Sequence, residues 1–195
     1  MNECKLSENN WTRVAVFAGG DRGHYRTDFD CFVGVDRGSL WVLEEDLPLT
    51  LAVGDFDSVT ADERQLIQKR AQHFVQAQPE KDDTDLELAL LTIFEKNPQA
   101  QVTIFGALGG RIDHMLANVF LPSNPKLAPY MRQIAIEDGQ NVIAYCPEGT
   151  SQLEPRSDYD YLAFMPVRDS QLTILGAKYE LTEENLKKCT LLTNI

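Results

Sequence analysis

The sequence lacks long apolar runs and runs of lysine or arginine, although it is 195 residues long. No stretch approaches the ~18 apolar residues of a membrane span, and residues 1–10 are polar, unlike a signal peptide. We therefore expect a cytoplasmic protein that does not contact membranes. The formal charge of −12 disfavours an extended polyanion such as DNA as a partner. A small anion such as a nucleotide remains compatible, provided that a metal ion and a few local cations neutralise it.

Cysteine and histidine are also scarce and widely spaced. Zinc sites and disulfide frameworks need clustered or paired ligands, which this spacing does not provide. We expect neither, and we expect Cys31 to be an apolar strand residue. The residues concerned are Cys4, Cys31, Cys146 and Cys189, with His24, His73 and His114.

Up to about residue 142, short apolar runs alternate with helical stretches. This alternation is typical of a mostly parallel, Rossmann-like sheet flanked by helices. Thr60 and Thr84 are each followed three residues later by glutamate, as in a capping box, and so predict helix starts. The helix after Thr84 is apolar on nearly every side and should be buried. Strands are expected at 14–17, 31–35, 49–53, 73–77, 102–105 and 133–136, with helices over 85–96 and from 112 to 122.

Beyond residue 141 the pattern changes to brief strands separated by proline- and glycine-containing turns. Strands are expected at 159–164, 171–175 and 178–181. This is typical of a small all-β unit, which we interpret as a sandwich. The predicted domains are an α/β catalytic, nucleotide-binding domain over 1–142 and a β-sandwich over 143–195.

Charged residues follow four of the predicted strands at the point where each strand ends. They are Asp36, the Gly54–Ser58 segment, the Lys81–Asp85 segment and the Gly106–His114 segment. Ligands of open parallel sheets bind beyond the carboxyl ends of the strands, so these segments should meet at one edge. Carboxylates about 5 Å apart repel by roughly 3 kcal/mol at an effective dielectric constant of about 20, which a hard cation relieves. The sequence therefore predicts a magnesium-dependent phosphate site.

Within these segments the residues differ in how clearly they point to a ligand. Asp55 and Asp57 are spaced so that both carboxylates can reach one ion, and the residues after them do not continue as a calcium-binding EF-hand loop. Asp82 best points into the crevice, whereas Asp85 either contacts ligand or complements the helix dipole. Lys81 is either a phosphate clamp or an ion-pair partner.

The Gly106–His114 segment combines a glycine turn with a forked cation at a helix start. It matches neither the Walker A pattern nor the dinucleotide fingerprint. Gly109 and Gly110 allow phosphate to approach backbone N–H groups, and Arg111 can grip phosphate oxygens. Asp113 and His114 either contact the ligand or orient Arg111.

Taken in order, these motifs resemble the thiamine pyrophosphokinase family. The corresponding segments are Asp36-Arg37-Gly38, Gly54–Ser58, Lys81–Asp85 and Gly106–His114, although Arg37 replaces a frequent glycine. The resemblance implies transfer of diphosphate from ATP to thiamine, giving thiamine diphosphate and AMP. It also implies an α/β domain, a β-sandwich, and a homodimer that shares the thiamine pocket between subunits.

The resemblance also assigns roles to individual residues. Asp55, Asp57 and Asp82 correspond to magnesium ligands and, with Arg111, to catalytic residues. Tyr179, in the Gly176–Tyr179 segment, corresponds to a residue of the thiamine pocket. After Leu186 the sequence departs from the family's Ser-Asn-Glu-Phe segment and is short. The residues corresponding to the nucleotide site are Asp36, Lys81, Thr84, Asp85, Gly109, Gly110, Arg111, Asp113 and His114.

Two other readings of the sequence remain open. Asp55-Phe56-Asp57-Ser58-Val59 also suits a haloacid-dehalogenase-like phosphohydrolase with Asp55 as nucleophile, although that reading leaves the Gly106–His114 segment unexplained. A non-catalytic protein that binds thiamine or nucleotide is the third reading. Release of AMP would distinguish thiamine pyrophosphokinase from the non-catalytic binding protein. A trapped phosphoaspartate on Asp55 would identify the phosphohydrolase.

Overall fold

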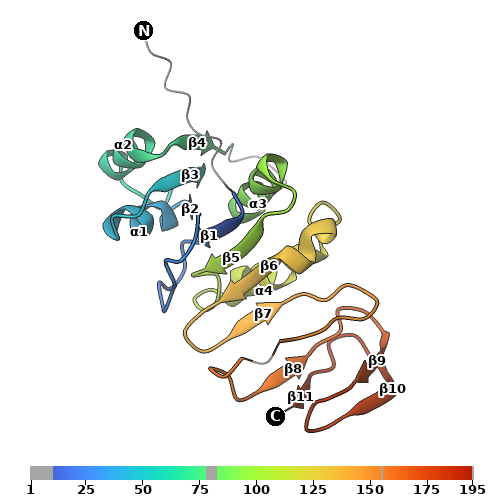
Figure 1. Ribbon diagram of the computed structural model, residues 1–195. Coiled ribbons are helices and arrows are strands. Elements are labelled where there is room, and N and C mark those ends of the chain that lie inside the picture. Colours follow the sequence, from blue (N-terminus) through green and yellow to red (C-terminus); the bar gives the residue numbers. More distant parts are fainter. Residues whose placement is uncertain (1–10, 78–82, 155, 195) are drawn as a thin grey trace. The chain divides into compact units, whose positions relative to one another are not determined.

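The computed structural model describes residues 11–77, 83–154 and 156–194 (Figure 1). The chain divides into two compact units, one extending to Gly149 and one beginning at Thr150. Among the described residues, no helix is both long enough and apolar enough to cross a membrane.

The first unit is built on a seven-stranded sheet in the order β4-β3-β2-β1-β5-β6-β7 (Figure 1). All neighbouring strands are parallel except β6 and β7, which pair antiparallel. The strands are β1 (Arg13–Phe17), β2 (Cys31–Val35), β3 (Leu49–Gly54), β4 (His73–Gln76), β5 (Gln101–Phe105), β6 (Ile134–Glu137) and β7 (Val142–Ala144). In the part of this unit that the structure describes, four helices and two 3-10 segments accompany them: α1 (Gly38–Glu44), α2 (Ala61–Arg70), α3 (Asp85–Lys96), α4 (Ile112–Phe120), η1 (Leu121–Ser123) and η2 (Ala128–Gln133).

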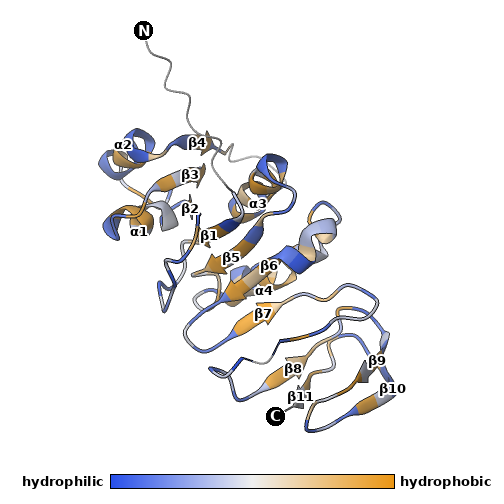
Figure 2. Ribbon diagram, viewed as in Figure 1, coloured by the Kyte–Doolittle hydropathy of each residue, from blue (hydrophilic) through white to orange (hydrophobic). Residues whose placement is uncertain are grey.

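The two faces of the sheet carry separate apolar clusters. Along β1, Val14 and Val16 belong to the cluster that α3 covers, whereas Ala15 and Phe17 belong to the cluster of α1 and α2. This alternation follows from the two-residue repeat of a strand. Figure 2 shows the central strands as mainly hydrophobic and α2 as mainly hydrophilic. Helices therefore cover both faces of the sheet, as predicted for a Rossmann-like domain.

Capping explains where α2 and α3 begin. The Thr60 hydroxyl accepts the Glu63 N–H, while the Glu63 carboxylate accepts the Thr60 N–H at 2.7 Å, completing the predicted box. The Thr84 hydroxyl accepts the Glu87 N–H at 3.2 Å. Helix α3 buries six residues, in agreement with its apolar sequence: Leu86, Glu87, Ala89, Leu90, Ile93 and Phe94.

The second unit contains two antiparallel strand pairs. β9 (Ser170–Ile174) pairs with β10 (Leu181–Leu186), and β8 (Leu162–Phe164) pairs with β11 (Leu192–Asn194). A small all-β unit, interpreted as a sandwich, was predicted here, and the structure contains small antiparallel sheets; the strand expected at 178–181 lies later, in β10. The reason is a turn: Gly176 has φ of +77° and its N–H donates to the Glu180 carboxylate at 2.7 Å.

Three further elements of the structure were not predicted. Helix α1 lacks a side-chain cap and β11 lies in the last residues, so neither carries a local signal. Strand β7 extends the first sheet, and the first unit consequently runs to Gly149 rather than ending at the expected boundary of 142.

Candidate functional site

The acidic residues come together beyond the carboxyl ends of the neighbouring parallel strands β2 and β3. These two strands lie to one side of the point between β1 and β5 where the strand order reverses. Asp36 directly follows β2, Asp55 directly follows β3, and Asp85 opens α3. Ligands of open α/β sheets bind beyond the carboxyl ends of the strands.

Asp36, Asp55 and Asp85 form one cluster of carboxylates. One oxygen from each side chain lies within 4.8 Å of the others, and all three side chains are half-buried. Three anions at this spacing repel one another strongly unless a cation or protons compensate the charge. Hard carboxylate oxygens from separate loops are the donors that magnesium takes in proteins, leaving positions for water or phosphate oxygens. The donor set therefore fits a divalent cation.

Asp36 is held by its backbone in an uncommon conformation. Its φ is +47°, in the left-handed region, and its N–H donates to the Val53 carbonyl at 2.9 Å. The carboxylate accepts the Phe56 N–H at 3.1 Å. A β-carbon on Gly54 would lie 1.9 Å from Asp36 Oδ1, so only glycine allows the two loops to approach this closely.

Burial and the neighbouring carboxylates change the protonation of Asp36. Burial, together with the charges of Asp85 and Asp55, raises the pKa of Asp36 to about 7. The Phe56 N–H acts in the opposite direction by stabilising the charged form. Without a cation, the cluster therefore retains a proton near neutral pH.

Phe56 separates the two aspartates that flank it. It is buried, with φ of +60°, and stacks on Phe74 with ring centroids 4.8 Å apart. A bulky residue rarely adopts positive φ, so packing must compensate the strain. Asp55 joins the cluster, whereas Asp57 is exposed and donates its N–H to Asp55 Oδ1 at 3.0 Å.

The structure thus brings together a set that differs from the predicted ligands Asp55, Asp57 and Asp82. Among the described residues the cluster holds Asp55 together with Asp36 and Asp85, which were predicted for the nucleotide, and Asp57 lies outside it. Lys81 and Asp82 lie outside the described residues. The positive φ of Asp36 and the fit against Gly54 depend on the tertiary fold, so the sequence alone did not group the Asp36 carboxylate with those of Asp55 and Asp85.

The glycine turn after β5 lies beside the segment that follows β1. The Ala18 N–H donates to the Phe105 carbonyl at 2.9 Å, and the Gly20 N–H donates to the Gly106 carbonyl at 3.0 Å. Gly109 and Gly110 both take positive φ, of +85° and +67°. A β-carbon on Gly110 would meet nothing within 4 Å, which leaves this turn open to a ligand. The Gly19–Gly20 pair, which follows β1 after Ala18, is the sequence signal that could have predicted this contact.

Arg111 is paired within its own turn. Its Nη2 lies 2.6 Å from Asp113 Oδ2, and its Nε donates to Asp113 Oδ1 at 3.2 Å. This bidentate contact lowers the pKa of Asp113 and raises that of Arg111. Both side chains are exposed, as is that of His114. This contact is the one that the predicted role of Asp113 in orienting Arg111 requires, and the role itself stays a prediction.

Tyr179, the residue predicted for thiamine, belongs to the second unit. It lies in the turn between β9 and β10 and is 56% exposed. Lys178 Nζ lies 5.5 Å from the centroid of its ring. The Tyr179 ring is therefore accessible to solvent, and the Lys178 ammonium lies within cation–π distance of it.

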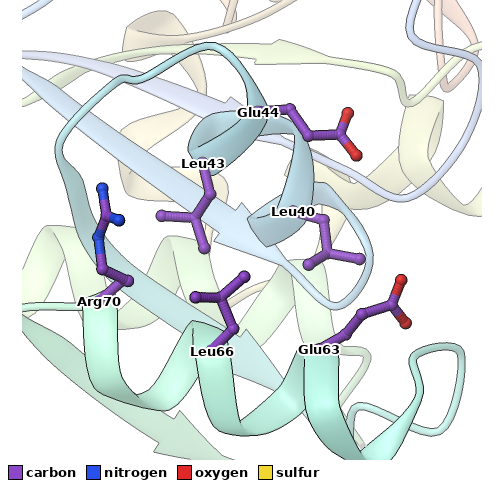
Figure 3. A pocket seen from close by; sticks show the side chains of 6 residues that line it. All are labelled: Leu40, Leu43, Glu44, Glu63, Leu66 and Arg70. Atoms are coloured by element: carbon purple, nitrogen blue, oxygen red, sulfur yellow. The ribbon is translucent and has the colours of Figure 1, made fainter.

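A pocket of about 270 Å³ lies between α1 and α2 (Figure 3). Leucines form its apolar part, with Leu43 and Leu66 pointing toward one another, and no predicted site residue lines it. Its lining residues are Leu40, Leu43, Glu44, Glu63, Leu66 and Arg70. Nothing in this pocket resembles the convergent carboxylates, which remain the candidate site.

Comparison with known proteins identifies relatives of the chain. Residues 23–130 match the family model described as "Thiamin pyrophosphokinase, catalytic domain". A curated protein named thiamine pyrophosphokinase from Bacillus subtilis (strain 168) is 36% identical over 176 residues, covering 86% of this chain and 81% of the relative.

Solved structures give the same result. A crystal structure of a thiamin pyrophosphokinase family protein from Enterococcus faecalis matches with a TM-score of 0.89 and 42% identity, covering 93% of this chain and 88% of that one. Thiamin pyrophosphokinase from Geobacillus thermodenitrificans matches with a TM-score of 0.76 and 33% identity, covering 94% and 87%.

Proposed function

Because the chain belongs to the thiamin pyrophosphokinase family, we propose that it transfers diphosphate from ATP to thiamine at the convergence of Asp36, Asp55 and Asp85. It is an enzyme, a diphosphotransferase. The observation that supports this location is the clustering of three carboxylates from separate loops beyond the carboxyl ends of β2 and β3. The family model spans all three residues.

In the proposed reaction the hydroxyethyl oxygen of thiamine attacks the β-phosphorus of ATP. The bond from that phosphorus to the oxygen it shares with the α-phosphate breaks, AMP leaves, and the hydroxyl proton goes to a base. Magnesium, held by Asp36, Asp55 and Asp85, would supply positive charge to the phosphates. The backbone N–H groups around Gly109 and Gly110, with Arg111, would bind phosphate oxygens.

Asp57 is our candidate for the proton acceptor. It is exposed next to Asp55 and lies outside the carboxylate cluster. Its alternative role as a ligand, and that of Asp82, remain predictions from sequence, as do the nucleotide contacts of Lys81, Thr84, Asp113 and His114.

The homodimer, its shared thiamine site with Tyr179, and the cytoplasmic location are also proposals. One feature supports the dimer. Helix α4 buries none of its residues, and its Ile112 and Leu116 side chains are exposed. An exposed apolar helix face is typical of a surface that another subunit covers.

The direct test is to incubate the protein with magnesium, ATP and thiamine and to measure thiamine diphosphate and AMP. We expect equal amounts of both products, and no reaction when EDTA replaces magnesium. ADP in place of AMP would contradict the two-phosphate transfer. A phosphoaspartate on Asp55 would instead favour the phosphohydrolase, and ligand binding without AMP would favour the non-catalytic reading.

Matched Asp→Asn variants distinguish the proposed ligands from the proposed base. Asp55→Asn and Asp85→Asn should lower kcat/KM by about 100-fold or more and raise the magnesium concentration for half-maximal rate. Asp57→Asn should lower kcat while leaving that magnesium concentration unchanged. The assignment of Asp57 fails if its variant has the magnesium requirement of Asp55→Asn.

A further inference from the structure

The first turn of α3 carries a buried acid that the proposed reaction does not use. Glu87 is 6% exposed and lies two residues after the cluster member Asp85. Its carboxylate accepts a hydrogen bond from the side-chain amide of Asn124. A buried carboxylate is stable only when such partners replace water.

Asn124 is fixed on all sides by its own loop. Its N–H donates to the Leu121 carbonyl at 2.9 Å, and its side-chain oxygen accepts the Lys126 N–H at 2.9 Å. Its carbonyl accepts the Leu127 N–H at 2.9 Å, and Leu127 is fully buried in the core beneath the sheet. The amide that reaches Glu87 therefore projects from an anchored segment.

A second contact joins the same two segments. Lys126 Nζ lies 2.5 Å from Asp83 Oδ1, just before the start of α3. The segment 124–126 thus contacts the start of α3 on both sides of Thr84 in the chain. Lys126 pairs with Asp83 before Thr84, and Asn124 donates to Glu87 after it. Asp85 lies between these two contacts in the chain.

We propose that Asn124 and Lys126 are positioning residues that fix the first turn of α3 and so place the Asp85 carboxylate beside those of Asp36 and Asp55. This inference rests on the proposed function, since it assigns Asp85 to the metal. The physical reason is that three ligands from separate loops bind an ion tightly only if each loop is held before the ion arrives. A loosened α3 start would weaken the metal site first and the thiamine site little.

The test measures Mn²⁺ binding by electron paramagnetic resonance, without substrates, alongside the magnesium dependence of the rate. Asn124→Asp places a second carboxylate against Glu87 and should weaken Mn²⁺ binding by about tenfold. The double variant Glu87→Gln/Asn124→Asp reverses donor and acceptor at unchanged net charge. It should bring Mn²⁺ affinity back to within about twofold of the unmodified protein.

Lys126 provides a second variant at an exposed position, where folding is not at risk. Lys126→Met should raise the half-saturating magnesium concentration by about threefold, with the KM for thiamine unchanged. Lys126→Arg should restore the magnesium concentration of the unmodified protein.

Asn97 serves as the control, because it caps the other end of α3 and its side-chain amide donates to the Trp11 carbonyl at 3.0 Å. Asn97→Asp should lower the melting temperature without changing Mn²⁺ affinity.

The outcomes separate the inference from the proposed function. If the unmodified protein binds no Mn²⁺ in a way that depends on Asp55, the proposed site is wrong. If it binds Mn²⁺ but Asn124→Asp and Lys126→Met bind it equally well, the positioning role is wrong. Loss of thermal stability alone, as in Asn97→Asp, would also overturn that role.

Discussion

At the scale of single residues, the site depends on conformations that are unfavourable in isolation. Asp36 and Phe56 both adopt positive φ, and the carboxylates of Asp36, Asp55 and Asp85 repel one another. Packing of Phe56 on Phe74, and the hydrogen bond from Phe56 N–H to Asp36, offset part of this strain. Such strain is expected where geometry serves a ligand rather than stability.

The raised pKa of Asp36 predicts how stability varies with pH. Since the pKa of Asp36 is about 7 in the folded protein against an ordinary value of 3.8, the folded state binds the proton more tightly. Its contribution to stability is therefore complete below the unfolded value and is lost as pH rises through about 7. In EDTA, Asp36→Asn should increase the free energy of unfolding at pH ~8 by about 1–2 kcal/mol, allowing for solvent screening, and change it little at pH ~4.

This prediction is measured by urea unfolding at both pH values. Asn retains the oxygen that accepts the Phe56 N–H, so the variant removes charge with little change in shape. Saturating magnesium should reverse the order of stability at the higher pH, because only the unmodified protein keeps all three ligands. Equal stability of the two proteins in EDTA at both pH values would show that the Asp36 charge is not repelled by Asp55 and Asp85.

At the scale of elements, close approach between the loops after β2 and β3 places the ligands. Gly54→Ala would put a β-carbon 1.9 Å from Asp36 Oδ1. The loops must then separate, so we expect a loss of about 2 kcal/mol or more in stability and a loss of activity at moderate magnesium concentration. Differential scanning calorimetry and the product assay measure the two effects.

Gly110→Ala is the matched control for this variant. Its β-carbon would meet nothing within 4 Å, and only the positive φ of +67° opposes it. A cost of about 1 kcal/mol is expected from the backbone alone. If the two alanine variants were equally stable, contact with Asp36 would not be the reason for glycine at position 54.

The caps of α2 and α3 allow structural and functional roles to be compared. Thr60→Ala and Thr84→Ala each remove a hydroxyl that accepts an N–H at the third helical position, and each should cost about 1 kcal/mol. Only Thr84→Ala should also raise the half-saturating magnesium concentration, because Thr84 directly precedes Asp85. The same effect on both variants would show that the requirement follows global stability.

At the scale of the whole molecule, the two units differ in how much apolar surface they bury. Two large clusters stabilise the first unit, whereas Ile174 and Leu186 are the buried apolar residues described in the second. A small unit with little core of its own gains stability from association.

We therefore expect a homodimer in solution, detected by size-exclusion chromatography with light scattering. Leu116 is 45% exposed on α4, where Leu116→Glu should shift the protein toward monomer. Gln68→Glu, on the polar helix α2, changes the charge by the same amount and should leave the mass unchanged. A monomeric unmodified protein would remove the basis for a shared thiamine site.

The sequence by itself determined the parallel strands of the sheet, the helices that start at Thr60 and Thr84, and the order of the motifs, because hydrophobic repeat and capping are local properties. It also predicted that Asp36, Asp55 and Asp85 belong to one edge, since the ends of parallel strands meet there. Only the tertiary structure decided which carboxylates cluster. Which oxygen points inward depends on the positive φ of Phe56, the missing side chain of Gly54 and the anchoring of α3, all of which arise from contacts between segments far apart in the chain.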